Sequence, residues 1–333
     1  MASVAAHMNG TIVRNLGRLA LRARFATGSW LRPAATLHRA YRLFCTPLPA
    51  SRQRAASVDG GDVAVSSFAH GGQQIGLYAW GDPAAQPYVL LAHGWSSHAM
   101  RFLRWVRPLR DAGYAVVGFD QVGHGRSSGR RSHLPGFDDL LGEVARRHGN
   151  AAAVIAHSLG GAATVLAAAD GLAADRMILI APVADPAAAA SRFARFVGLA
   201  EHLATHLFDE FEARHPLRVA DLQAHLKAPV IARPALVVHD LDDRDVPWPE
   251  GERIARYWPA ARLLTTSGLG HHRIVDDGAV IEAGLRFLRG EAVGERVVSS
   301  PNLLDGLAVA RGTGSLHGGD SRLLRGWCGS ASS

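Results

Sequence analysis

The stretch that decides the fold is Ala156-His157-Ser158-Leu159-Gly160, which lies between a short apolar run and an alanine-rich segment. Residues 152–157 predict a buried strand, and the residues after Ser158 predict a helix. At so tight a turn from strand to helix, a strained backbone lifts the serine hydroxyl clear of the sheet, and small residues must flank it two positions away. The pattern predicts an exposed nucleophile, although a plain turn into a buried helix would also fit these five residues.

Around this turn, short apolar runs punctuated by glycine and proline alternate with amphipathic segments from Asp62 onward. This alternation predicts an α/β fold with a mainly parallel sheet flanked by helices. We expect strands at 63–67, 74–80, 88–92, 114–119, 152–157, 177–180, 235–239 and 262–265, and helices at 102–111, 137–148, 250–257 and 275–288. Residues 183–227 carry helical pieces without a strand signal, which predicts a small helical cap inserted between two strands.

The serine turn resembles the nucleophile elbow of the α/β-hydrolase superfamily, whose usual pattern is G-x-S-x-G, with Ala156 in place of the first glycine. The resemblance implies the chain order serine, acid, histidine. Residues 239–247 resemble the family's H-G-x-x-D-x-x-V-P segment, which puts the acid at Asp243. Gly268-Leu269-Gly270-His271 is similar to the G-x-G-H turn, which makes His271 the general base.

Neighbouring residues leave alternatives open at both positions. Asp242 or Asp245 could be the acid instead of Asp243. Otherwise these two and Asp240 are expected to be loop caps or solvated charges. His272, directly after His271, is the competing histidine.

Acyl transfer also needs backbone donors for the oxyanion. One is expected at Leu159, directly after the nucleophile. His93-Gly94-Trp95 resembles the family's H-G-x turn, which puts the second donor at Trp95, with His93 bracing the turn. Residues 120–127 resemble the structural D-x-x-G-x-G-x-S turn, so neither Asp120 nor His124 is given a catalytic role. A phosphate cradle is not favoured there, because the full G-x-G-x-x-G spacing is missing.

The chain has 333 residues, 48% of them apolar and 20% charged, which is typical of a globular protein. The net charge of +7 is uneven, because nine arginines precede the first acidic residue, Asp59, and the remainder is close to −2. A nucleic-acid partner is therefore not predicted for the catalytic part. Cys45 and Cys328 suggest neither a disulfide nor a metal site, and no cofactor motif is present.

The N-terminal residues have neither an apolar run long enough to cross a membrane nor the apolar core of a secretory signal. Ile12, Leu16, Leu19 and Ala23 form an apolar stripe at helical spacing, surrounded by arginines. Three interpretations stay open: a helix of a cytoplasmic protein, a basic helix that contacts a membrane surface, and an organelle transit peptide. We expect three regions: a basic extension at 1–42, a catalytic domain at 43–290 containing the cap, and a flexible tail at 291–333.

The resulting hypothesis is a cytoplasmic serine hydrolase that cleaves carboxylic esters through an acyl-enzyme and needs no cofactor or metal. The preferred substrate is a small-molecule acyl ester, lipid-like in the nearer variant, so the expected enzyme is a carboxylesterase. A lysophospholipase or other lipid-ester hydrolase, or a thioester hydrolase, is the alternative within the fold. A binding protein that has kept the fold without turnover is the alternative from another class.

Overall fold

The computed structural model describes residues 2–297, and the side chains of residues 16–297. Contacts between residues divide the chain into two compact units. The helical unit comprises Met1–Thr46 and Pro186–Leu222, and the α/β unit comprises Pro47–Asp185 and Gln223–Ser333. Most of the predicted flexible tail, from residue 298 onward, lies outside the described residues.

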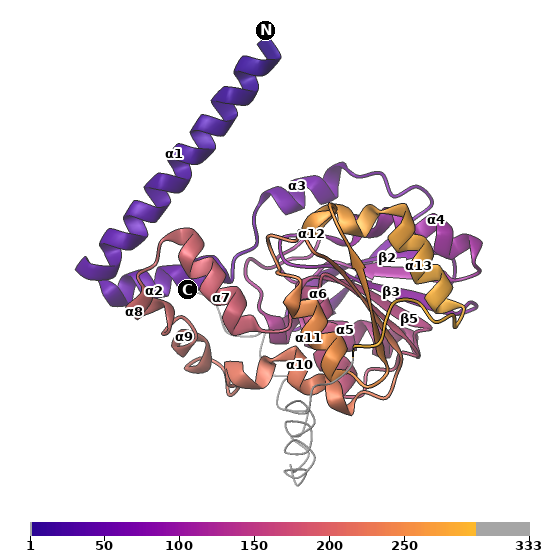
Figure 1. Cartoon of the computed structure of the whole chain (residues 1–333). Helices are drawn as coiled ribbons and strands as arrows, with labels where there is room; N and C mark the ends of the chain where they lie inside the picture. Colours follow the sequence, from indigo (N-terminus) through magenta and orange to yellow (C-terminus); the bar gives the residue numbers. More distant parts are fainter. Residues whose placement is uncertain (1, 298–333) are drawn as a thin grey trace. The chain divides into compact units, whose positions relative to one another are not determined.

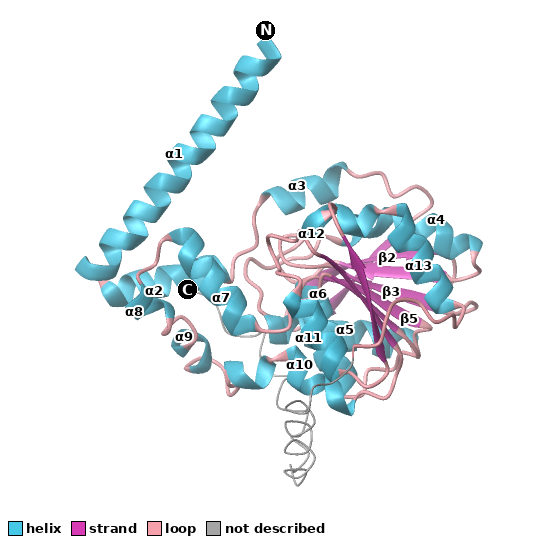
Figure 2. Ribbon diagram, in the orientation of Figure 1, coloured by secondary structure: helices cyan, strands magenta, loops and turns pink. Residues whose placement is uncertain are grey.

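The α/β unit is built on an eight-stranded sheet with the strand order β1-β2-β4-β3-β5-β6-β7-β8. Figure 2 draws the strands in magenta with helices around them. Strands β3 to β8 run parallel, while β1 and β2 form an antiparallel hairpin that pairs with β4. The predicted mainly parallel sheet is confirmed, including the hairpin turn at Gly71 and Gly72. The strands are β1 Ala64–His70, β2 Gln73–Trp80, β3 Tyr88–Ala92, β4 Ala115–Phe119, β5 Ala153–His157, β6 Met177–Ile180, β7 Ala235–Asp240 and β8 Ala261–Thr266.

The central strands are buried on both faces, since every residue of β3, β4, β5, β6 and β7 is buried. A parallel sheet of this kind must be covered by helices on each side. Helices α4 (Leu103–Asp111) and α13 (Gly278–Leu288) pack together on one face, whereas α5 (Leu134–His148), α6 (Leu159–Ala169) and α11 (Pro249–Tyr257) lie on the other (Figure 1). The sheet is thereby fixed between two helical layers, with its strand ends left to carry loops.

Six short helices complete the described part of the α/β unit. They are α3 Ala50–Ser57, η1 Ala99–Phe102, α10 Ala224–Lys227, η3 Ala228–Val230, α12 Gly270–Arg273 and η4 Ile274–Asp276. The edge strand β8 pairs with residues that follow the last helix, α13. Leu263 and Glu295 exchange two backbone hydrogen bonds of 2.7 and 2.8 Å. The beginning of the segment predicted as a flexible tail therefore pairs with the sheet.

The helical unit joins two segments that are far apart in the sequence. Its elements are α1 Ala2–Leu31, α2 Pro33–Phe44, α7 Pro186–Val197, α8 Glu201–Ala204, α9 Asp209–Glu212 and η2 Val219–Leu222. The rings of Phe44 and Phe193 lie 5.1 Å apart, and the guanidinium of Arg22 donates to the carbonyl of Phe196 at 3.1 Å. The residues predicted as an N-terminal extension thus pack with most of the predicted cap. The domain boundaries drawn from the sequence stay a prediction.

Within the described residues, no helix combines the length and the apolar character that crossing a bilayer would require.

Candidate active site

Ser158 lies at the sharp turn between β5 and α6, as the elbow pattern predicts. Its backbone is strained, with φ at 56° and ψ at −120°, a conformation that non-glycine residues rarely adopt. Directly after it, α6 begins close against β3, because a Cβ added at Gly160 would lie 2.5 Å from the carbonyl oxygen of Ala92. Ala156 is fully buried, so its methyl group is accommodated where the usual pattern has glycine.

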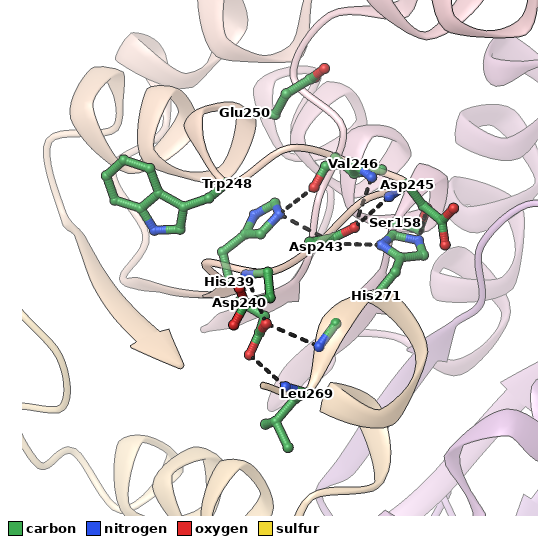
Figure 3. A network of polar contacts seen from close by, with 12 residues as sticks. Ser158, His239, Asp240, Asp243, Asp245, Val246, Trp248, Glu250, Leu269 and His271 are labelled. Atoms are coloured by element: carbon green, nitrogen blue, oxygen red, sulfur yellow. Dashed lines mark hydrogen bonds and ion pairs between the residues drawn. The ribbon is translucent and has the colours of Figure 1, made fainter. Parts of the chain in front are cut away.

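The three side chains predicted to act together are adjacent in space (Figure 3). The Nε2 atom of His271, on α12, lies 3.0 Å from the Oγ atom of Ser158. Its Nδ1 atom lies 2.7 Å from Oδ2 of Asp243, in the loop after β7. All three residues follow the carboxyl ends of parallel strands and are largely buried. With the Nδ1 proton donated to the carboxylate, Nε2 is free to accept the hydroxyl proton of the serine.

The carboxylate of Asp243 is held by its own loop. Its Oδ1 atom accepts hydrogen bonds from the amides of Asp245 and Val246, each at 2.9 Å. His239 donates from Nε2 to the carbonyl of Val246 at 2.9 Å and lies 3.5 Å from Oδ2. Burial alone would raise the pKa of Asp243, but contacts with His239 and His271 and the backbone donor at Val246 hold it well below its usual range. The group is therefore a carboxylate at neutral pH.

Asp240 anchors the backbone of the turn that carries His271. Its carboxylate accepts from the amides of Leu269 and Gly270 at 3.1 and 3.0 Å and from the Thr266 hydroxyl at 2.7 Å (Figure 3). These donors outweigh the effect of burial and lower the pKa of Asp240. Of the two roles expected for Asp240, loop cap or solvated charge, the structure shows the cap, and the loop that it caps is the histidine turn.

The two competing aspartates contact partners other than His271. Asp242 is exposed and accepts from the amide of Gly268 at 2.8 Å. Asp245 is also exposed, with its carboxylate 3.5 Å from Nε2 of His272. The structure thus brings Asp243 against His271, whereas Asp245 lies against the neighbouring histidine.

The loop after β3 runs directly beside the nucleophile. A Cβ added at Gly94 would lie 2.8 Å from the Cβ of Ser158, so only glycine allows this approach. Trp95 follows and lines the same pocket as the serine. Ser96 has a strained φ of 52°, and its amide donates to Nε2 of His124 at 3.0 Å. The assignment of Trp95 and Leu159 as oxyanion donors stays a prediction.

Two buried histidines brace this loop in their neutral form. His93 accepts the amide of Gln121 on Nε2 at 3.0 Å, while His124 accepts that of Ser96. Burial lowers the pKa of His93, and it lowers that of His124 to about 2. Since an imidazole can accept a hydrogen bond only on an unprotonated nitrogen, the lowered pKa values keep the loop in place.

His157, directly before the nucleophile, has a position that local sequence patterns do not indicate. Its Nε2 atom donates to the backbone carbonyl of His271 at 2.9 Å, and the two rings lie 4.6 Å apart. Burial, together with the neighbouring His271, holds the pKa of His157 well below its usual range. This neutral imidazole joins the serine turn to the histidine turn.

The serine opens into a pocket of about 660 Å³. Its lining combines apolar, cationic and imidazole groups from the loop after β3, from α3 and from the histidine turn: Arg54, Ser57, Val58, Trp95, Ser96, Ser97, His98, Met100, Arg101, His157, Ser158, His271 and His272. No acidic side chain is among the described residues that line it. Nor does the described part of the chain hold a cluster of three or more histidine, cysteine or acidic side chains suited to a metal.

Comparison with known proteins identifies the family. A family model described as "Serine aminopeptidase, S33" (Hydrolase_4) matches residues 83–262, more than half of the chain. The chain belongs to this family. The range that matches the S33 model contains Ser158 and Asp243 and ends before His271.

The proteins similar to this S33 hydrolase include one named as a lipase. A monoacylglycerol lipase from Mycolicibacterium smegmatis (strain ATCC 700084 / mc(2)155) is 36% identical over 101 residues, which cover 27% of this chain and only 36% of the relative. The alpha/beta hydrolase domain-containing protein 10 from mouse superposes with a TM-score of 0.55 at 16% identity, covering 73% of this chain and 99% of the mouse chain. Est1E from Butyrivibrio proteoclasticus, solved with ferulic acid bound, gives a TM-score of 0.53 at 21% identity over 68% of this chain and 98% of Est1E. The two structures show the α/β-hydrolase fold.

Proposed function

We propose that this S33-family chain is a serine hydrolase that cleaves carboxylic ester bonds, with Ser158 as nucleophile, His271 as general base and Asp243 as the orienting acid. The observation that carries the proposal is the continuous contact from the Asp243 carboxylate through His271 to the Ser158 hydroxyl, 2.7 and 3.0 Å long, at a pocket. The similarity to a monoacylglycerol lipase supports the same chemistry.

Acylation would begin when His271 Nε2 takes the proton of Ser158 as its Oγ atom attacks the ester carbonyl carbon. The carbonyl oxygen becomes an oxyanion, which the amides of Leu159 and Trp95 would stabilise. When the tetrahedral intermediate collapses, the bond to the alcohol oxygen breaks, and His271 returns the proton to the leaving alcohol. Asp243 stays ionised throughout and stabilises the imidazolium.

Deacylation would repeat these steps with water. His271 removes a proton from the water molecule that attacks the acyl-enzyme, and the bond between the acyl carbon and Oγ then breaks. The proton returns to Ser158 and the carboxylic acid leaves. The mechanism needs no cofactor, because the chain supplies nucleophile, base and oxyanion donors.

The proposed substrate is a small acyl ester, and a lipid-like ester fits the pocket well. Val58, Trp95 and Met100 offer apolar surface near the serine. The guanidinium of Arg54 offers a cationic group, whereas that of Arg101 is paired with Asp276. A peptide with a free N-terminus fits less well, because the ammonium group would meet the guanidinium of Arg54 and no carboxylate among the described lining residues. We therefore favour ester over aminopeptidase activity in this member of the family.

A labelling experiment tests the nucleophile. A fluorophosphonate probe should label the wild-type chain and the exposed-site control Ser66→Ala, and it should not label Ser158→Ala. Absence of labelling in well-folded wild type would contradict the assignment of Ser158.

Substrate panels then separate the alternatives. We expect hydrolysis of p-nitrophenyl esters of graded chain length to exceed that of aminoacyl p-nitroanilides and of acyl thioesters. Faster release from the anilides would favour an aminopeptidase, and faster release from the thioesters would favour a thioester hydrolase. Equal ester hydrolysis by wild type and Ser158→Ala would favour a binding protein without turnover.

A further inference from the structure

Over residues 16–31, the part of helix α1 whose side chains the structure describes, one face is covered and the opposite face carries exposed apolar side chains. Phe25 and Ser29 are buried in the helical unit, and the Ser29 hydroxyl donates to the carbonyl of Phe25 at 2.7 Å. On the opposite face, Leu16, Leu19 and Trp30 are 60%, 62% and 75% exposed. Residues three and eleven positions apart lie on the same side of a helix, so these three side chains form one strip.

Exposed apolar side chains are concentrated in the helical unit more than elsewhere. Among the described residues, eleven large apolar side chains are exposed, and six of them belong to this unit, which holds a quarter of the chain. The six are Leu16, Leu19, Trp30, Leu31, Leu43 and Phe196. Scattered apolar residues are ordinary on a protein surface, but a helical strip of them marks a surface that another phase or molecule covers.

The same unit carries most of the positive charge. It contains eleven arginines and five acidic residues, so it accounts for +6 of the net charge of +7, and none of the acidic residues lies in α1 or α2. Arg24 and Arg32 are exposed beside the strip. Arg18 lies over the ring of Phe196, 5.0 Å from its centre, which holds another guanidinium at the surface.

We propose that the strip of α1 formed by Leu16, Leu19 and Trp30 binds an anionic lipid surface. Arginines beside an exposed apolar strip are what a helix lying in the bilayer interface presents: the apolar side chains enter the acyl region and the cations meet lipid phosphates. Tryptophan is favoured at that depth, since its ring is apolar and its indole N–H remains hydrated. A protein partner would need an apolar groove bordered by acidic residues, whereas an anionic membrane supplies apolar chains and phosphates side by side.

Vesicle flotation with the full chain tests this proposal. The Ser158→Ala variant is used, so that hydrolysis does not alter the lipids and the result does not depend on the proposed function. We expect the protein to float with vesicles of phosphatidylcholine and phosphatidylglycerol at low salt, to float much less with phosphatidylcholine alone, and to be released as salt rises.

Paired variants separate the strip from general surface effects. Leu19→Glu with Trp30→Glu should lower the bound fraction at least ~10-fold, because two apolar contacts are lost and two repulsive charges are added. The matched control, Leu226→Glu with Val230→Glu, changes two exposed apolar residues of the α/β unit. The control should bind vesicles as the parent does, and circular dichroism should show that all three proteins are folded.

Two results would overturn the proposal. One is no flotation with anionic vesicles at low salt. The other is equal flotation of the two double variants. If sedimentation instead shows self-association that only Leu19→Glu with Trp30→Glu abolishes, and the parent binds no vesicles, the strip is an interface between two copies and the lipid assignment is wrong.

Discussion

The carboxylates of Asp240 and Asp243, three residues apart at the end of β7, bind two different parts of the loop that carries His271. Asp240 accepts from the backbone amides of Leu269 and Gly270, and Asp243 accepts from the imidazole itself. One carboxylate therefore sets where the turn lies, and the other sets how the ring is oriented. The two can be tested separately.

Replacing Asp243 should affect turnover far more than replacing its neighbour. Asp243→Asn should lower kcat about 10⁴-fold, since an amide can stabilise the wrong imidazole tautomer and does not stabilise the imidazolium. Asp245→Asn, at an exposed carboxylate, should change kcat only a few-fold. Steady-state hydrolysis of a p-nitrophenyl ester measures both. A larger loss for the Asp245 variant would move the acid to that position.

Replacing Asp240 should destabilise the fold as well as slow the reaction. In Asp240→Asn, the amide NH₂ faces backbone N–H donors, and a buried donor left without an acceptor costs about 1–3 kcal/mol. Urea unfolding should show this loss, and the rate of fluorophosphonate labelling should fall in protein that is still folded. Asp242→Asn, at an exposed position, serves as the control. Unchanged labelling in Asp240→Asn would argue against a positioning role.

Gly160, two residues after the nucleophile, should tolerate no side chain. In Gly160→Ala, the new methyl group would lie 2.5 and 2.6 Å from the carbonyl oxygens of Ala92 and His93, and both are backbone atoms that cannot swing away. We expect lower thermal stability and loss of probe labelling. Gly142→Ala, on α5, meets nothing within 4 Å and should stabilise the protein by about 0.5–1 kcal/mol. Equal melting temperatures for the two variants would contradict this packing.

The buried histidines should make the fold acid-sensitive. Burial lowers the pKa of His124 to about 2 in the folded chain, so below the ordinary value of 6.5 the unfolded chain binds a proton that the folded chain does not. The contribution of His124 to the free energy of unfolding is fully present above pH 6.5. It is lost as the pH falls from there towards 2, by up to about 1.4 kcal/mol per pH unit.

A substitution isolates this contribution. His124→Gln keeps a side-chain acceptor for the amide of Ser96 but cannot be protonated in this range. Urea unfolding between pH 6 and pH 4 should therefore show a shallower loss of stability than in wild type. Identical slopes for the two proteins would show that His124 does not titrate as the structure implies.

Much of the sheet could be predicted from the sequence because its strands are buried on both faces. The unbroken apolar runs at 88–92 and 177–180 coincide with β3 and β6. The contact of Ser158 with His271 could be predicted because short turns of this sequence match those of α/β-hydrolases in the chain order serine, acid, histidine. A cytoplasmic location and the absence of a nucleic-acid partner stay predictions.

Other features depend on contacts between distant segments, which local patterns do not contain. The bond from His157 to the carbonyl of His271 joins residues 114 positions apart. The packing of Phe44 on Phe193 likewise unites α2 with α7, although each helix alone shows only an amphipathic pattern. Local periodicity shows that a face is apolar, but it does not show which partner covers it.

The chain leaves the α/β unit after Asp185 and returns to it at Gln223. Next to these points, the amide of Ala224 donates to the carbonyl of Ala184 at 2.9 Å. The two ends of the inserted segment 186–222 are therefore held close together. A short linker could join Asp185 to Gln223 without disturbing β6 or β7. Evolution or an engineer could therefore replace the segment 186–222 with a different sequence and alter this hydrolase while its sheet stays unchanged.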